Sequence, residues 1–281
     1  MDRRQFIQGA GALAASAAAL RNLFGQKGAV KIGMCSWSLG GKDPSVFGLA
    51  KRIGFEGLQL DLGRLADNAS LRKPEVRRPY KEAARAAGVA IPSTAIVAYN
   101  QLPLKSEPKA AIWLNDAVEA TRDLGARVHM LCFFGKGELK EENAEEIERL
   151  VVVIREVAPR AEKAGVILGI ENTLTARANV AILDRVNSPA VQVWYDVGNT
   201  FGKGYDVPAE IRMLAGRICE FHIKDNPHLL GQGRLPFPEV ARAILDIGYR
   251  GWLMLETSSP NKDLEGDARR NLAFARQLFT S

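Results

Sequence analysis

Four short apolar runs in the C-terminal half of the chain each end in a side chain that can bind a metal ion. The side chains are Glu171, Asp196, His222 and Glu256, and the runs are GVILGIEN, VQVWYDVGN, ICEFHIKD and GWLMLET. If these runs are parallel strands of one barrel, their carboxyl ends reach the same rim, where the catalytic groups of such barrels collect. The four side chains would then converge on one point. Three carboxylates and one imidazole suit Mn²⁺ or Mg²⁺ and, less well, Co²⁺ or Zn²⁺.

The chain after residue 28 alternates strand-like and helix-like segments with a period of roughly thirty residues, as expected of repeated βα units. We predict strands at 30–35, 57–60, 89–97, 128–133, 166–170, 191–195, 218–221 and 252–255. Helices are predicted at 44–53, 107–124, 141–164, 207–215, 238–247 and 264–279, and a basic segment around 72–78 leads into a further helix that ends at Gly88. Continuously apolar strands indicate a parallel sheet that is buried on both faces.

Eight such strands in 281 residues predict one α/β domain, a (β/α)8 TIM barrel over residues 28–281. A doubly wound open sheet is the competing architecture. Its nucleotide-binding members carry the order G-x-G-x-x-G after the first strand, whereas this chain has GMCSWSLGG there. The closed barrel is therefore favoured.

The N-terminal residues 1–27 resemble a twin-arginine export signal. Paired arginines, Arg3 and Arg4, precede a weakly apolar run, and Ala15-Ser16-Ala17 is a plausible cleavage box. The run has about a dozen residues, too few to span a bilayer in the mature protein. We expect the twin-arginine machinery as a partner and a periplasmic or otherwise exported location; an alanine-rich helix is the alternative.

Charge and cysteine content exclude some functions. The net charge is +6, but the basic residues are spread along the chain, which gives no indication of nucleic-acid binding. The three cysteines, Cys35, Cys132 and Cys219, lie in or at the ends of predicted strands without metal-type spacing. They are interpreted as buried thiols.

A single carboxylate at a strand end is explained as well by a salt bridge as by a metal ion. Three carboxylates and a histidine on four successive strand ends are harder to explain without a cation, because ionised carboxylates repel one another and are costly to bury unpaired. We expect Asn172 to orient Glu171 from an outer shell. Lys224 and its outer-shell neighbour Asp225 are expected to face substrate oxygens or to pair with each other.

The ordered motifs IENT, YDVGN, FHIKD with a later GQG, and LET resemble the xylose-isomerase-like barrels of the sugar phosphate isomerase/epimerase superfamily. The run GFEGLQL is similar to the second strand of that superfamily. Its members include ketose 3-epimerases, inosose dehydratases and family 2 AP endonucleases. The resemblance covers nearly all of the chain after the signal, and it is specific for the superfamily but not for one member.

The resemblance implies a single Mn²⁺-type ion bound by the four strand-end residues, with Glu171 and Glu256 also acting as the acid/base pair. One glutamate would take a proton from a keto-sugar and the other would return one to the opposite face of the metal-stabilised enediolate. Trp37, Asn199, Lys224 and His228 are the expected substrate contacts. Asn199 and His228 differ from the histidine and arginine of many ketose epimerases at these positions, so the substrate stays open.

Three functions follow from this interpretation. The leading one is a metal-dependent sugar isomerase or epimerase, with an unphosphorylated substrate if the protein is exported. The second is a lyase acting on an inosose or a 3-keto-glycoside, because both reactions begin with proton abstraction beside a carbonyl. The third is a non-catalytic sugar-binding barrel. The DNA-repair endonucleases are set aside, because their three-metal cluster needs more histidines than the three in this chain.

Overall fold

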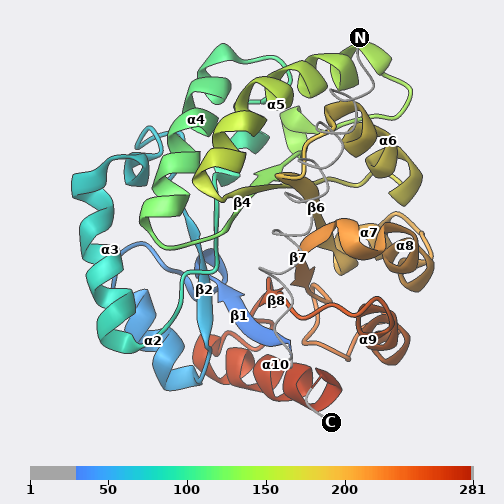
Figure 1. Ribbon diagram of the computed structural model, residues 1–281. Coiled ribbons are helices and arrows are strands. Elements are labelled where there is room, and N and C mark those ends of the chain that lie inside the picture. Colours follow the sequence, from blue (N-terminus) through green and yellow to red (C-terminus); the bar gives the residue numbers. More distant parts are fainter. Residues whose placement is uncertain (1–29, 280–281) are drawn as a thin grey trace, which may run out of the picture.

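The computed structural model describes residues 30–279, so the predicted signal at 1–27 lies outside the described residues. Within residues 30–279, eight parallel strands pair in sequence order and β8 pairs with β1, which closes the barrel. Helices surround the strands (Figure 1). The strands are β1 (Lys31–Cys35), β2 (Gly57–Asp61), β3 (Ser93–Ala95), β4 (Val128–Cys132), β5 (Ile167–Glu171), β6 (Val191–Asp196), β7 (Ile218–Ile223) and β8 (Trp252–Leu255).

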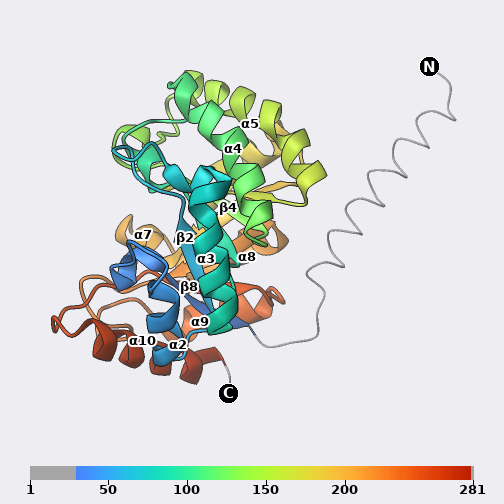
Figure 2. The same ribbon diagram turned by 90° about the vertical axis from the view of Figure 1, so that its left-hand side faces the viewer.

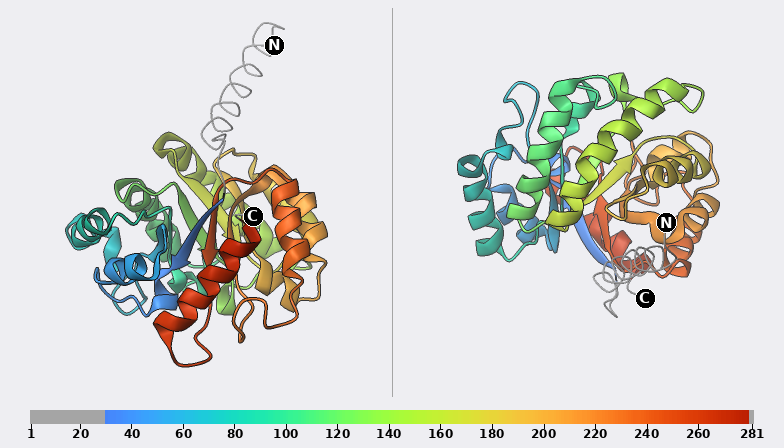
Figure 3. Two further views of the ribbon diagram at one scale, coloured as in Figure 1. Left: turned by 90° about the horizontal axis from the view of Figure 1, so that it is seen from below. Right: turned by 45° about the horizontal axis from the view of Figure 1, so that its top comes forward.

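The outer layer is a ring of helices, seen from further directions in Figures 2 and 3. Its α-helices are α2 (Val46–Ile53), α3 (Pro74–Ala87), α4 (Pro108–Asp123), α5 (Ala144–Ala164), α6 (Ala176–Val186), α7 (Val197–Gly202), α8 (Val207–Leu214), α9 (Phe237–Asp246) and α10 (Leu264–Phe279). Short 3₁₀ turns are η1 (Ser36–Leu39), η2 (Ser70–Arg72), η3 (Val97–Asn100), η4 (Gly135–Gly137) and η5 (Ala215–Arg217). The ring closes where α10 contacts both α2 and α9.

The strands form where the sequence is continuously apolar, because both faces of each strand are covered. Every residue of β4, β5 and β7 is buried. The predicted TIM barrel is confirmed, and most strand bounds agree to within one or two residues. The third strand is the exception, since only β3 forms within the predicted 89–97. Pro92, directly before β3, has no N–H to donate to a neighbouring strand. After β3 the chain turns into η3.

Two helices were not located from the sequence. The first, α6, begins after Thr175, whose hydroxyl accepts a hydrogen bond from the N–H of Ala178. The second, α7, begins directly after the strand-end Asp196, which caps it. Both starts follow from the preference of helix N-termini for Thr and Asp side chains. Because α7 follows β6 with no intervening loop, Asp196 is both the last residue of β6 and the N-cap of α7.

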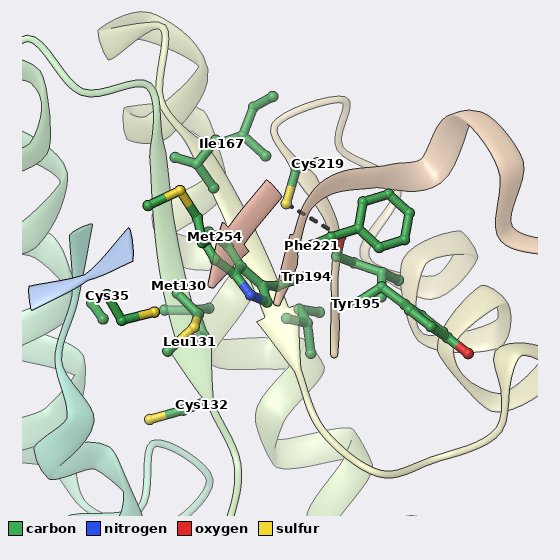
Figure 4. Packing of buried hydrophobic residues seen from close by; sticks show 14 of the residues in the cluster. Cys35, Met130, Leu131, Cys132, Ile167, Trp194, Tyr195, Cys219, Phe221 and Met254 are labelled. Carbon is green, nitrogen blue, oxygen red and sulfur yellow. Dashed lines mark hydrogen bonds between the residues drawn. The ribbon is translucent and has the colours of Figure 1, made fainter. Parts of the chain in front are cut away.

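The predicted buried thiols are confirmed. Cys35, Cys132 and Cys219 are all buried and free. Figure 4 shows Cys219 apart from the other two, where its thiol donates a hydrogen bond to the carbonyl of Val193, 3.2 Å away. Among the helices of residues 30–279, none has the length and apolar character needed to cross a membrane.

Candidate metal centre

The strand ends of β5 to β8 bring the four predicted ligands together. Glu171 and Asp196 are the last residues of β5 and β6, and Asp196 lies opposite His222 in the β6–β7 register. Glu256 directly follows β8. One ligand atom from each side chain lies within 4.8 Å of all the others. The expected convergence at the carboxyl rim is therefore present in the structure.

The geometry of the cluster fits one divalent ion. The Nδ1 atom of His222 lies 2.9 Å from Oε1 of Glu171, 3.6 Å from Oδ2 of Asp196 and 3.6 Å from Oε2 of Glu256. An ion with bonds of about 2.1 Å places opposite ligands about 4.2 Å apart, close to the observed span. The Oδ2 atom of Asp196 is buried and lies beside the Lys224 ammonium without a well-aligned hydrogen bond, which leaves a lone pair for a cation. The residues therefore fit a divalent ion with oxygen and nitrogen ligands.

Asp196 is held by both of its oxygens. Oδ1 accepts a hydrogen bond of 2.8 Å from the backbone N–H of Asn199, in the first turn of α7. Oδ2 lies 2.7 Å from Nζ of Lys224. Burial by itself raises the pKa of Asp196, but the Lys224 ammonium and the neighbouring imidazole outweigh burial and hold the pKa at about 2. Asp196 is therefore ionised at neutral pH.

Lys224 occupies a central position in the cluster. Its Nζ also lies 2.6 Å from Oε2 of Glu256, so one ammonium pairs with two of the four candidate ligands. Burial by itself lowers the pKa of Lys224, but Asp196 and the two glutamates raise it well above its ordinary value. A divalent ion and one ammonium together balance the charge of three carboxylates. Of the two alternatives expected for Lys224, the pairing with Asp225 is not formed, because the ammonium turns toward the cluster.

Trp37 holds the remaining oxygen of Glu256. Its indole Nε1 donates a hydrogen bond of 2.9 Å to Oε1, and its ring meets the imidazole of His222 edge-on at 6.1 Å. The Glu256 side chain is 23% exposed, whereas that of Glu171 is 3% exposed. The two glutamates thus have unequal access to solvent, a difference that the sequence did not reveal.

Burial and charge shift the proton affinities in the cluster. Burial raises the pKa of Glu171 to about 7, despite the attraction of the neighbouring imidazole. Burial alone would lower the pKa of His222, but the anionic groups around it, including Glu256 and Glu171, raise the pKa well above its ordinary value. The pKa of Glu171, near neutrality in this cluster, suits a group that gives and takes protons.

Sequence reasoning missed the residues behind His222. Its Nε2 lies 2.7 Å from Oε1 of Gln59 on β2 and 3.4 Å from the thiol of Cys35. Burial raises the pKa of Cys35 to about 12, so this thiol stays protonated. The ring of Trp194 packs edge-on against the imidazole at 4.8 Å. An amide inside an otherwise apolar strand was the signal that could have identified Gln59.

Other predicted residues lie elsewhere than expected. We expected Asn172 to orient Glu171, but its side chain hydrogen-bonds Asn179 at the start of α6 and the N–H of Leu174. Asp225 accepts hydrogen bonds from the N–H groups of Gly231 and Gly233, so it shapes the GQG loop. A Cβ at Gly233 would lie 2.2 Å from the Asp225 carboxylate, which explains the glycine there. His228 is exposed.

A cavity of about 680 Å³ adjoins the cluster at Trp37. It is lined by residues at or beyond the carboxyl ends of β1, β2 and β3, including Ser36, Asp61, Arg64 and Gln101. Burial raises the pKa of Asp61 to about 7. The volume lies in the range of about 300–1,000 Å³ that is usual for small-molecule sites.

A larger cavity of about 940 Å³ opens at the opposite end of the barrel. It is lined at the starts of β6, β7 and β8, for example by Gln192, Cys219 and Gly251. None of the four cluster residues lines either cavity, but Trp37, which donates a hydrogen bond to Glu256, lines the smaller one. Because the functional groups of such barrels collect at the carboxyl ends of the strands, the smaller cavity is the relevant one.

The fold and the cluster together define a TIM barrel with a candidate divalent-metal centre at its carboxyl rim. The chain belongs to the family described as xylose isomerase-like TIM barrel, which matches residues 47–278. This confirms the superfamily to which the sequence motifs pointed.

Sugar epimerases, which are isomerases, are among the relatives of this chain. L-ribulose-5-phosphate 3-epimerase UlaE of Escherichia coli strain SMS-3-5 is 26% identical over 228 residues, which cover 74% of this chain and 79% of that protein. The putative L-ribulose-5-phosphate 3-epimerase SgbU of Escherichia coli K12 is 27% identical over 238 residues, covering 74% and 81%.

Solved structures share the fold. A D-psicose 3-epimerase determined in the presence of D-fructose has a TM-score of 0.73 and 18% identity, and the match covers 89% of this chain and 99% of that one. The 3-keto-D-glucoside 4-epimerase YcjR from E. coli has a TM-score of 0.72 and 15% identity, with 88% and 99% covered.

Proposed function

We propose that this protein is a divalent-metal-dependent epimerase or isomerase acting on a keto-sugar. The observation that carries the proposal is the convergence of three carboxylates and one imidazole within 4.8 Å at the carboxyl rim. The epimerase names of the relatives support the reaction class. Mn²⁺ is the ion that we expect, with Mg²⁺, Co²⁺ or Zn²⁺ as alternatives.

The proposed mechanism places a sugar carbon between Glu171 and Glu256. One carboxylate removes the proton beside the carbonyl and the other returns a proton to the opposite face, which inverts the carbon. When bound, the ion supplies Lewis-acid stabilisation of negative charge on the substrate oxygens. Trp37 and Lys224 fix the two oxygens of Glu256, and Lys224 has one further N–H for a substrate oxygen.

The cavity beside Trp37 gives room for the rest of the sugar. The Asn199 side chain in the first turn of α7 and the exposed His228 are proposed as further substrate contacts. An unphosphorylated sugar is the proposed substrate, in keeping with export.

The test combines metal analysis with proton exchange. We expect Glu171→Gln and Glu256→Gln each to lower turnover by about 10²–10⁴-fold, because each removes one acid/base group, and to weaken Mn²⁺ binding. The exposed Glu82→Gln is the matched control and should behave like wild type. Incubation with keto-sugars in D₂O should place deuterium at one carbon of the recovered sugar.

Each other outcome has a meaning. Full activity of either active-site variant would refute the two-carboxylate mechanism. Loss of water or of an aglycone, instead of deuterium incorporation, would identify a lyase. Mn²⁺ binding without exchange across a broad keto-sugar panel would identify a sugar-binding barrel.

We also propose that residues 1–27 direct export by the twin-arginine route. The paired Arg3 and Arg4 before an apolar run support this proposal. Replacing both arginines by lysine should keep the protein in the cytoplasm, as measured by cell fractionation. Unchanged distribution of the double variant would contradict it.

A further inference from the structure

Gln59 lies directly behind the imidazole of the candidate metal centre, on a strand that supplies none of the four candidate ligands. It belongs to β2, is fully buried, and faces His222 across the barrel. Its Oε1 is 2.7 Å from Nε2 of His222, the ring nitrogen that points away from the three carboxylates. The ligand geometry described above assigns this amide no function.

The surroundings of Gln59 determine which way its amide group is turned. Nε2 of Gln59 lies 3.4 Å from the sulfur of Met130, and a thioether can only accept a hydrogen bond. The NH₂ group therefore belongs on the Met130 side. A flipped amide would turn its oxygen toward the Met130 sulfur, where no donor is present, and its NH₂ toward the Cys35 thiol.

The oxygen of Gln59 is left facing two donors. The Cys35 thiol donates to it at 3.2 Å, and the second lone pair faces Nε2 of His222. A carbonyl oxygen has no proton to give, so the His222 nitrogen must be the donor. An imidazole that binds a metal ion is neutral, so only one of its nitrogens carries hydrogen, and Nδ1 then keeps its lone pair.

Nδ1 is the atom that lies 2.9 Å from Glu171 and 3.6 Å from both Asp196 and Glu256. We propose that Gln59 is a positioning residue that holds His222 in the Nε2–H tautomer, so that the Nδ1 lone pair faces the bound divalent ion. The inference rests on the proposed metal site but not on the identity of the sugar. A neutral amide also orients the ring without adding a fourth negative charge to the cluster.

Two variants of Gln59 separate positioning from packing. Gln59→Met keeps the size but removes the acceptor, and we expect it to weaken Zn²⁺ and Mn²⁺ binding by about 10- to 100-fold. Gln59→Glu keeps an acceptor beside Nε2 and should bind these ions within a few-fold of wild type or more tightly. A packing role predicts the reverse order, because methionine fits an apolar interior and a buried carboxylate does not.

The tautomer can be observed directly. The chain has three histidines, so ¹⁵N-histidine labelling gives three imidazoles, which single-histidine variants assign. In the Zn²⁺-bound wild type, we expect a proton on Nε2 of His222 and none on Nδ1. A proton on Nδ1 of His222 in the Zn²⁺-bound wild type, or equal metal affinity of wild type and Gln59→Met, would overturn the role of Gln59.

The outcomes distinguish this inference from the proposed function. If Zn²⁺ does not bind the wild-type protein, the metal site and the role of Gln59 both fail. If Zn²⁺ binds with the expected tautomer and no keto-sugar exchanges its proton, only the proposed reaction fails.

Discussion

At the level of single residues, the candidate ligands are oriented by bonds that use their other polar atoms. Asp196 is fixed through Oδ1 by an N–H of α7, and His222 through Nε2 by Gln59. Glu256 is fixed by Trp37. A ligand whose second atom is already bonded loses little conformational freedom when a metal binds, because its rotamer is set beforehand.

Replacing Lys224 should lower the stability of the metal-free protein and raise its affinity for Mn²⁺. In Lys224→Met, the metal-free protein should be destabilised by on the order of 3 kcal/mol, because buried carboxylates lose their counter-ion. Mn²⁺ should bind about tenfold more tightly, because the competing ammonium is gone. Denaturant unfolding and calorimetric titration measure the two effects.

The control for this prediction is Lys203→Met, which removes a lysine from an exposed ion pair with Glu138. It should change neither quantity measurably, because exposed pairs contribute little. Weaker Mn²⁺ binding by Lys224→Met would show that the ammonium supports the cation site instead of competing for it.

At the level of elements, α7 connects a strand end to the cluster. The helix begins at the candidate ligand Asp196, and its first turn packs against Lys224. A Cβ at Gly198 would lie 2.6 Å from Cγ of Lys224 and 3.1 Å from its carbonyl oxygen. Only a residue without a side chain lets the helix approach β7 this closely.

We therefore expect Gly198→Ala to destabilise the protein by about 1–3 kcal/mol, since either α7 or Lys224 must shift. Gly202→Ala in the same helix is the matched control, because its Cβ would meet nothing within 4 Å. The control should be as stable as wild type or more stable, since alanine favours helix over glycine. Urea unfolding measures both, and equal stability of the two variants would contradict the close approach.

At the level of the whole molecule, the closed parallel barrel directs every strand end to one rim while the helices cover the outer face. Buried polar groups outside the rim then affect stability rather than chemistry. His129 on β4 is an example, because it is fully buried, its Nδ1 bonds Thr94 at 2.8 Å, and its Nε2 has no hydrogen-bond partner among the described residues. Burial lowers its pKa to about 3.

Because the pKa of His129 is lowered in the folded protein, we expect the protein to lose stability in acid. The pKa of this residue is about 6.5 in the unfolded chain, so between pH 6.5 and 3 the unfolded state binds a proton that the folded state does not. The free energy of unfolding should therefore fall as the pH falls through this window, by up to about 1.4 kcal/mol per pH unit from this residue. Its contacts Thr94 and Tyr99 carry no charge there.

Urea unfolding at several pH values tests this. His129→Gln should lose less stability than wild type between pH 6.5 and 4. The slope of its unfolding free energy against pH should be smaller by the amount that corresponds to about one bound proton. His228→Gln removes the exposed histidine and should follow wild type. Parallel pH profiles for wild type and His129→Gln would show that the buried ring is already protonated in the folded state or titrates normally.

The fold could be predicted from local pattern, because short apolar runs at regular spacing allow little besides a parallel sheet covered on both faces. The four strand-end side chains could be predicted for the same reason, since parallel strands have one shared direction. The third strand was overestimated, because an apolar run does not show that regular pairing begins only after Pro92 and ends at Ala95.

The sequence by itself thus determined the barrel, the rim and the four groups that meet there. Only the tertiary structure decided how those groups are held. Gln59 and His222 are 163 positions apart, and Trp37 and Glu256 are 219 apart, so no local pattern links them. Asn172 bonds Asn179 and Lys224 pairs with Asp196, contacts that were not expected from the sequence. Hydrogen bonds depend on distances of a few tenths of an ångström across the barrel, and these are set only when all eight strands pack together.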